Sequence, residues 1–140
     1  MVILPRLLVR KSKIDNFGIF STTEILPNTY LIEYTGEKIT NLEAERRELE
    51  NEKKGATYIF CLDDNYSIDA AVGGNDSKYL NHSCDPNCKI VRKMGKILVY
   101  SKRLIKPSEE LTIDYSFDKD SKKEICKCGS ENCRSFMNEG

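Results

Sequence analysis

The stretch YLNHSCDPNC, residues 79–88, contains the only histidine of the chain and two of its six cysteines. Its Asn, Ser, Asp and Pro residues favour turns, so composition alone predicts a surface loop. The loop is an unusual one, because an amide, an imidazole and a thiol side chain occur together at residues 81, 82 and 84. This combination makes residues 81–84 the centre of a candidate site.

The composition of the chain is that of a single globular domain. Its 140 residues allow one hydrophobic core but are too few for two ordinary domains. With 39% apolar and 31% charged residues, the chain resembles folded, soluble proteins. The 22 basic and 22 acidic residues cancel, which argues against a broad cationic surface that binds nucleic acid directly.

The start of the chain does not predict a signal peptide, because Pro5 and Arg6 interrupt its apolar residues. No later apolar run approaches the length of a membrane span. We therefore expect an intracellular protein that makes no membrane contact. A freestanding domain beginning at Met1 suits a prokaryotic or viral protein, and equally a fragment of a eukaryotic one. The sequence predicts no particular oligomeric state.

Short runs of β-branched and aromatic residues predict a mainly β protein. Runs at residues 7–12, 17–22 and 30–37 are separated by turn residues, and two predicted hairpins follow, with turns at residues 63–65 and 94–95. A last strand is expected in ELTIDYSF, residues 110–117. Thr40 followed by Glu43 forms a capping box, which predicts a helix over residues 40–53.

The C-terminal cysteines have spacing typical of metal ligands. Cys126, Cys128 and Cys133 form a C-x-C-x4-C cluster, which supplies three sulfur ligands, whereas a tetrahedral zinc ion takes four. Distance along the chain does not identify the fourth ligand. Cys84 is a candidate because it is expected in a loop, which the tail can reach by folding back. The alternative is that these are unrelated thiols.

Taken together, the motifs resemble those of the SET-domain protein lysine methyltransferases that carry a post-SET zinc tail. The resemblance rests on three motifs in order: NHSCDPNC at residues 81–88, ELTIDY at 110–115 and the cysteine cluster at 126–133. YTGE at 34–37, YIF at 58–60 and GN at 74–75 extend it. It implies a β-rich α+β fold of several small sheets, with residues 81–84 threaded under a loop as a C-terminal pseudoknot. Residues 1–117 would form the SET domain and residues 118–140 a post-SET linker and cysteine tail.

The resemblance also implies a function. It is that of a protein-lysine N-methyltransferase, with S-adenosylmethionine as the methyl donor and a lysine of a histone tail or another basic protein as the acceptor. The implied catalytic residues are Tyr115, which would position the reacting groups, and Tyr58, a wall of the lysine channel. The residues implied to bind the cofactor are Asn16, Phe17, Gly18, Lys78, Tyr79, Asn81, His82 and Phe136. The implied ligands of a structural zinc ion are Cys84, Cys126, Cys128 and Cys133.

Methyl transfer to an amine needs orientation of two reactants and an uncharged lysine, which an apolar channel favours. In the family a tyrosine two residues before the active-site tyrosine limits the number of methyl groups added. This chain has Ile113 there and Ile90 at a second such position, so a di- or trimethylated product is expected.

Two other predictions stay open. The chain can instead be a non-catalytic SET-like module that contains zinc and binds peptides. An acidic approach for a basic tail, or simply a solvated edge, can be formed by Glu109, Glu110, Asp114, Asp118 and Asp120. The expected location is the cytoplasm for a prokaryotic protein, and the nucleus or a host nucleus for one that acts on chromatin.

Overall fold

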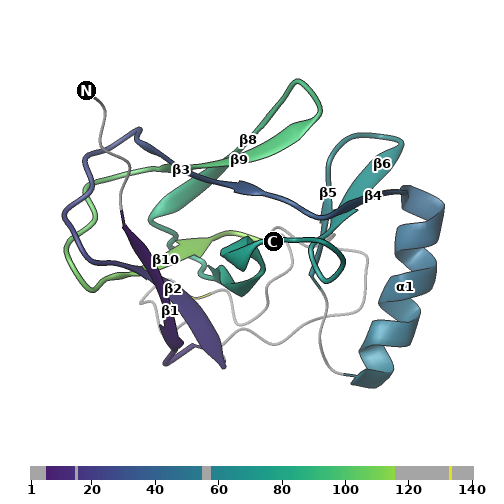
Figure 1. The fold of residues 1–140 in the computed structure, drawn as a ribbon, viewed down its shortest axis with the longest axis horizontal. Coiled ribbons are helices and arrows are strands. Elements are labelled where there is room, and N and C mark those ends of the chain that lie inside the picture. Colours follow the sequence, from purple (N-terminus) through teal and green to yellow (C-terminus); the bar gives the residue numbers. More distant parts are fainter. Residues whose placement is uncertain (1–5, 15, 55–57, 116–132, 134–140) are drawn as a thin grey trace. The chain divides into compact units, whose positions relative to one another are not determined.

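The computed structural model describes residues 6–14, 16–54, 58–115 and 133, and it confirms the prediction of a mainly β fold made of several small sheets (Figure 1). In chain order the elements are β1 (Leu7–Lys11), β2 (Phe17–Ser21), β3 (Tyr30–Tyr34), β4 (Glu37–Thr40), α1 (Asn41–Lys54), β5 (Ile59–Cys61), β6 (Tyr66–Asp69), the 3₁₀ helix η1 (Asp76–Tyr79), β7 (Asn81–His82), β8 (Cys88–Lys93), β9 (Lys96–Ser101) and β10 (Glu110–Ile113).

The chain forms two compact units, which are described separately. The first contains the described parts of residues 1–31, 79–90 and 99–140, and the second contains those of residues 32–78 and 91–98. A three-stranded sheet has the order β3-β9-β8. None of the helices in the part of the chain that the structure describes is long and apolar enough to cross a bilayer.

The first unit is built on a four-stranded sheet with the order β1-β2-β10-β7. β1 and β2 are antiparallel neighbours, as Figure 1 shows, and Glu110 of β10 lies opposite Phe20 of β2. β7 is parallel to β10, with Ile113 opposite His82, and it forms one edge of this sheet. Side chains on a strand alternate between two faces, and Ile19, Leu111 and Ile113 are all at most 1% exposed. β10 therefore supplies core residues and also holds residues 81–82 in the sheet.

The prediction that residues 79–88 form a surface loop is wrong for the centre of the stretch. Asn81, His82 and Asn87 are buried, and the first two are in β7. Burial is tolerated because their polar groups have partners. The side chain of Asn87 acts like a neighbouring strand: its Oδ1 accepts a hydrogen bond from Thr112 N at 2.9 Å, and its Nδ2 donates to Glu110 O at 2.7 Å.

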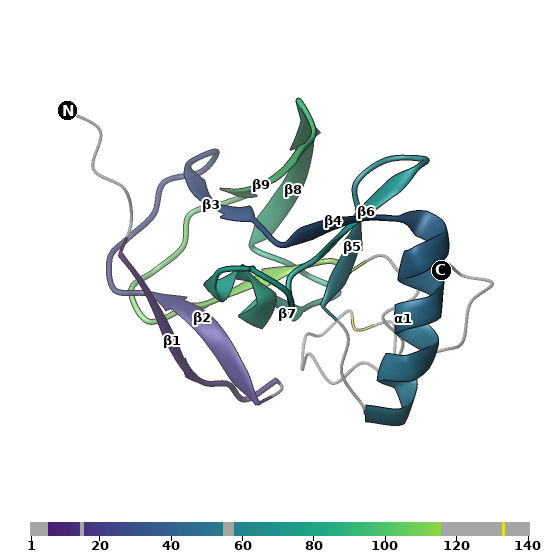
Figure 2. The same ribbon diagram turned by 45° about the vertical axis from the view of Figure 1, so that its right-hand side comes forward.

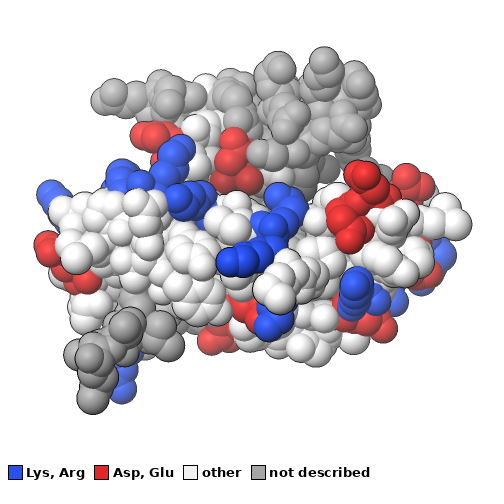
Figure 3. Space-filling model, turned by 90° about the horizontal axis from the view of Figure 1, so that it is seen from above, with Lys and Arg blue, Asp and Glu red and all other residues white. Residues whose placement is uncertain are grey.

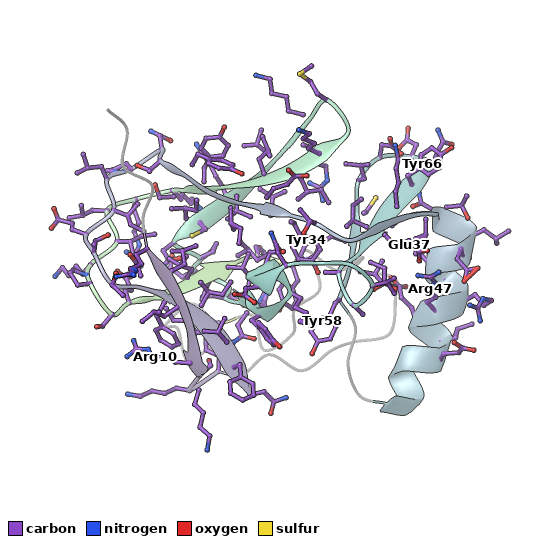
Figure 4. The ribbon with its side chains drawn as sticks, in the orientation of Figure 1. Arg10, Tyr34, Glu37, Arg47, Tyr58 and Tyr66 are labelled. Carbon is purple, nitrogen blue, oxygen red and sulfur yellow. The ribbon has the colours of Figure 1, made fainter. Side chains whose placement is uncertain are left out.

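The second unit contains the predicted helix and the first predicted hairpin, and both are confirmed. Thr40 Oγ1 accepts a hydrogen bond from Glu43 N, which caps α1. β6 pairs with β4 on one side and β5 on the other, and α1 runs beside them (Figure 2). The guanidinium group of Arg47 on α1 lies 2.6 Å from Glu37 and 3.0 Å from Asp69, which are opposite each other in the β4–β6 register, so Arg47 ties the helix to one end of this strand pair (Figure 4).

The second predicted hairpin is also confirmed. Met94 and Gly95 connect β8 and β9, and both have positive φ angles, 52° and 75°. Two consecutive residues with positive φ are typical of the tight turns that match the twist of two antiparallel strands. The predicted pseudoknot threading and the predicted boundary at residue 117 stay predictions, and residues 118–132 and 134–140 are outside the described part of the chain.

The described surface carries both signs of charge, as the balanced composition predicts. The face drawn in Figure 3 carries both acidic and basic side chains on its described part. The charged residues of α1 include ion pairs at i,i+3 and i,i+4 spacing, with Arg46 beside Glu43 and Glu50. Such exposed pairs contribute little to stability, so among the described contacts α1 is held mainly by its capping, by the buried Ala44 and by Arg47.

Candidate active site

The centre of the site is the side-chain amide of Asn81. Its Nδ2 lies 2.8 Å from Glu110 Oε2, 3.0 Å from Phe17 O and 3.1 Å from Ser12 Oγ. A carboxylate and a carbonyl can only accept hydrogen bonds, so the group that faces them must be the NH₂ of the amide. The chemistry of these neighbours therefore fixes which way the amide points.

The hydroxyl of Ser12 completes this arrangement. It donates to Glu110 Oε1 at 2.7 Å and accepts from Ile14 N at 2.9 Å as well as from Asn81. A hydroxyl has one donor and two acceptor positions, so these three contacts use all of them. Ser12 N also donates to Asn16 O at 3.0 Å, which closes the loop between β1 and β2.

The resemblance puts Asn16, Phe17 and Gly18 at the place of the family's glycine-rich cofactor loop, and in the structure they lie where the chain turns from β1 into β2. Asn16 stands in place of a glycine and has a φ of 32°, a conformation that Asn tolerates better than most residues. Gly18 is buried, and a Cβ atom there would lie 2.2 Å from Glu110 Oε2. Gly18 therefore leaves room for the carboxylate that contacts Asn81.

An aromatic pair lies next to the loop. The rings of Phe17 and Tyr79 are 6.1 Å apart, centre to centre, and meet edge to face. Phe17 is 47% exposed, so a large part of its ring is available to a flat or apolar group of a ligand.

His82 connects β7 to the end of β10. Its Nδ1 accepts a hydrogen bond from Tyr115 N at 3.0 Å. An acceptor nitrogen carries no proton, so the proton of the neutral ring is on Nε2, which lies 3.4 Å from Cys84 Sγ. Asp114 Oδ1 is 3.6 Å from Nδ1, a distance too long for a hydrogen bond, and the backbone donor takes precedence. His82 thus orders the backbone of Tyr115 and directs an N–H group at Cys84.

Tyr115 is half-buried and is held by contacts at both ends. Its backbone N–H binds His82, its ring packs edge to face against the imidazole at 5.4 Å, and its hydroxyl donates to Leu80 O. Because the phenolic hydrogen is directed to Leu80, the phenolic oxygen can act as an acceptor toward a ligand.

Two predicted site residues belong to the second unit. Tyr58 O accepts hydrogen bonds from Tyr34 Oη at 2.6 Å and from Ala70 N at 3.0 Å, which hold the backbone at Tyr58 in place. The Tyr58 residue is half-buried (Figure 4). Lys78 lies in the last turn of η1 and is half-buried.

The cysteines fall into different environments. Cys84 and Cys133 are half-buried, and Cys61 is exposed at the end of β5. Burial raises the pKa of the Cys88 thiol to about 12, so Cys88 is a core residue rather than a ligand or nucleophile. Cys126, Cys128 and Phe136 lie outside the described residues. Residues 6–14, 16–54, 58–115 and 133 alone contain no group of three His, Cys, Asp or Glu side chains able to hold a metal.

The structure thus brings together the predicted residues Phe17, Gly18, Asn81, His82 and Tyr115 through side-chain or backbone contacts within the first unit. Sequence reasoning missed Ser12, and it placed Glu110 on a possible acidic surface. Glu110 is instead directed at Asn81 and Ser12. Its position opposite Phe20, with Gly18 beside it, is a signal that only the strand register supplies.

Comparison with known proteins agrees with this arrangement. Residues 16–116 match the SET domain family. The chain is 42% identical over 134 residues to histone-lysine N-methyltransferase SETD1B of Homo sapiens, covering 91% of this chain and 7% of that protein. It is 40% identical over 137 residues to the H3 lysine-4 specific histone-lysine N-methyltransferase of Saccharomyces cerevisiae, covering 91% and 13%. Histone-lysine N-methyltransferase set-2 of Caenorhabditis elegans is 38% identical over 134 residues, covering 91% and 9%.

These relatives are much longer proteins, and the chain spans at most 13% of the length of any of the three. The similarity nevertheless extends over most of this chain, and the family match includes all of its described strands except β1. On the combined evidence of fold, motifs and sequence similarity, this chain belongs to the SET-domain family.

Proposed function

We propose that this chain is a protein-lysine N-methyltransferase that uses S-adenosylmethionine and acts on a lysine of a histone tail. The observation that supports this most directly is the connected set of Asn81, His82 and Tyr115, which joins a candidate cofactor strand to a candidate catalytic phenol. The three relatives named above are histone-lysine N-methyltransferases by name. A histone substrate also implies that the chain acts in a nucleus, on chromatin.

The residues of the first unit fit S-adenosylmethionine by their chemistry. Phe17 offers an exposed aromatic ring, and the edge strand β7 offers backbone donors and acceptors of the kind that read a nucleobase. The loop at Asn16–Gly18 and the amide of Asn81 offer polar contacts for the amino-acid end. Lys78, Tyr79 and Phe136 complete the predicted cofactor-binding set. When bound, this cofactor supplies a methyl group on a positively charged sulfur.

The protein's own contribution is orientation. The phenolic oxygen of Tyr115 can accept a hydrogen bond from the substrate amine, because the Tyr115 hydroxyl hydrogen is directed to Leu80 O. Tyr58 would form a wall of the lysine channel, and removal of water from a narrow apolar channel disfavours the charged form of lysine and lowers its pKa. Well-oriented reactants can gain up to about 7–11 kcal/mol relative to free ones, so no strong protein base is required.

We also infer a structural zinc ion held by Cys84, Cys126, Cys128 and Cys133. The contact that supports Cys84 is His82 Nε2 at 3.4 Å from its sulfur, since an N–H group directed at a thiolate stabilises the negative charge that zinc requires. Four sulfur ligands leave no position for water, so this zinc would dock the tail and take no part in the chemistry.

The experiment that tests the function is methyl transfer. The purified chain is incubated with S-adenosylmethionine carrying a radiolabelled methyl group and with core histones, and a second sample contains a nuclear extract. We expect label on lysine side chains of a histone. Cofactor binding without transfer to any protein in either sample would favour the non-catalytic, peptide-binding alternative, and absence of cofactor binding would refute both the donor and the enzyme.

A further inference from the structure

A pocket of about 590 Å³ lies in the first unit, and the proposed function does not use it. Strands β1, β2 and β10, together with the segments that follow β1 and precede β10, supply its lining. The lining residues are Arg10, Lys11, Lys13, Phe20, Ser108 and Glu110. Figure 4 shows Arg10 beside the β1–β2 pair. Pockets that bind ligands typically have volumes of about 300–1,000 Å³, so this one is large enough for a ligand.

The pocket has an excess of positive charge. Its lining includes three cationic side chains and one carboxylate, that of Glu110, which leaves two positive charges in excess. The carboxylate has partners of its own, because Oε1 accepts from Ser12 Oγ at 2.7 Å and Oε2 accepts from Asn81 Nδ2 at 2.8 Å. Within the described part of the chain, none of the three cations forms an ion pair. The charge of the pocket therefore favours an anionic ligand.

An aromatic ring holds one of these cations in place. The guanidinium carbon of Arg10 lies 4.4 Å from the centre of the Phe20 ring, which is a cation–π contact. Such a contact uses the charge of the guanidinium group and leaves N–H donors for an anion. A planar guanidinium group matches the oxygen atoms of a phosphate group and can bind two of them at once. Arg10 therefore offers a donor group whose position is already restricted before a ligand binds.

The lining also distinguishes between classes of anionic partner. Charged residues, lysine among them, are depleted in the cores of protein–protein interfaces, whereas Arg, Lys and Ser side chains are typical contacts of nucleic-acid phosphates. Proteins that bind single-stranded nucleic acids stack the bases on aromatic rings. Phe20 is half-buried and has Arg10 over its ring, so it is poorly placed for stacking. This combination favours the phosphate backbone of a duplex.

We propose that this pocket binds phosphate groups of double-stranded DNA through Arg10, Lys11, Lys13 and the hydroxyl of Ser108. The balanced composition argues against a broad cationic surface, but a contact of this size needs only a local excess of charge. The choice of DNA over duplex RNA rests on the proposed function, because histones are bound to DNA in chromatin. Phosphate contacts carry no sequence information, so the site binds duplexes of unrelated sequence alike.

The test measures binding of a fluorescent duplex to the whole chain by anisotropy, over a range of salt concentrations and without a methyl donor. The logarithm of the affinity should fall linearly with the logarithm of the salt concentration, with a slope of about −2.7 for three phosphate contacts. The pocket variant carries Arg10→Gln, Lys11→Gln and Lys13→Gln. Its affinity at low salt should be at least about 10-fold lower than that of wild type, and its slope should approach zero.

A control variant of equal charge separates the pocket from net charge. It carries Lys89→Gln, Lys102→Gln and Lys106→Gln, which are exposed residues of the same unit outside the pocket lining. This variant should keep the wild-type slope. Circular dichroism checks the folding of each variant. If the pocket variant does not fold, Lys13→Gln alone carries the test, because Lys13 is exposed and lies outside β1, and its loss should reduce the slope by about 1.

The other outcomes count against the proposal. An equal loss of affinity in the pocket and control variants would show an effect of net charge alone and would overturn the site. Tighter binding of polyglutamate, single-stranded DNA or duplex RNA than of duplex DNA would overturn the choice of partner. A wild-type chain that does not bind the duplex at low salt would refute the proposal and leave the methyl-transfer assay unaffected, so failure of this inference and failure of the proposed function are distinguishable.

Discussion

At the scale of single residues, His82 has contacts that restrict its protonation and its orientation. Its side chain is buried, its Nδ1 accepts from Tyr115 N, and its Nε2 is directed at Cys84. A lone histidine beside an asparagine is usually only a satisfied structural residue. Here the two ring nitrogens have different partners, so the ring has one tautomer and one orientation.

We expect His82→Leu to lower the free energy of unfolding by about 1–3 kcal/mol, because Tyr115 N would lose its acceptor in a half-buried position. His82→Asn should cost less, since its Oδ1 can take the place of Nδ1. Urea denaturation of both variants checks this. Equal stabilities for the two variants would show that the Nδ1 contact contributes nothing.

Tyr115→Phe should lose most turnover while it still binds S-adenosylmethionine. The change removes only the phenolic oxygen, whose role in the proposed mechanism is to position the amine, and losses of about 100-fold or more are typical for a positioned polar group. Steady-state kinetics and calorimetry measure the two effects. Tyr100→Phe is a suitable control, because Tyr100 packs against Tyr30. Near-normal turnover of Tyr115→Phe would place the active site elsewhere.

At the scale of elements, the side chain of Asn87 makes backbone hydrogen bonds to β10 of the kind that a neighbouring strand would make. β7 is short, and beyond it the backbone of β10 is paired by Asn87, whose amide binds Thr112 N and Glu110 O. Asn87 N donates in turn to Thr112 Oγ1 at 3.3 Å. This pairing explains why a polar turn-like sequence is buried, and it fixes β10 in the register that brings Glu110 to Asn81.

Asn87→Ala should therefore destabilise the fold by about 1–3 kcal/mol for each buried group left without its partner, here Thr112 N and Glu110 O. Asn87→Asp keeps the acceptor for Thr112 N but loses the donor to Glu110 O, so it separates the two contacts. Thermal unfolding of both variants is the measurement. A melting temperature for Asn87→Ala equal to that of wild type would contradict the strand-like role.

Signals within a few residues of sequence predicted the helix and the hairpins, but they did not predict which of these elements contact each other. The helix at 40–53 and both hairpins follow from capping, turn residues and alternation, all of which act over a few residues. The burial of residues 81–87 could not be predicted in this way, because their partners are about 25–30 residues away in sequence, in β10. Glu110 was misplaced for the same reason, since charge alone favours the surface.

At the scale of the whole molecule, the predicted zinc ion connects the tail to the site. The purified chain should contain about one equivalent of zinc by elemental analysis, because three tail cysteines and Cys84 make up a full tetrahedral set. A Cys126→Ser, Cys128→Ser double variant should lose the metal. Cys61→Ser, which changes an exposed cysteine outside this set, should retain it. Unchanged metal content in the double variant would refute the site.

The number of methyl groups that one chain adds depends on the space around the amine. A tyrosine hydroxyl at residue 113 or 90 would anchor a water molecule that restricts a methylated amine, and both residues are isoleucines here. Ile113 is fully buried in β10 and Ile90 is half-buried in β8, so neither supplies such a hydroxyl. A methylated amine should then have room to rotate and react again.

We therefore expect the wild-type chain to produce di- or trimethyllysine, as measured by intact-mass analysis of a peptide substrate over many turnovers. Ile113→Tyr should shift the products toward fewer methyl groups. Because Ile113 is fully buried, the larger ring can cost about 1–3 kcal/mol in stability, so the melting temperature is measured in parallel. Ile90→Tyr tests the same principle at a half-buried residue if Ile113→Tyr fails to fold. A wild-type product that stops at one methyl group would show that another residue closes the space.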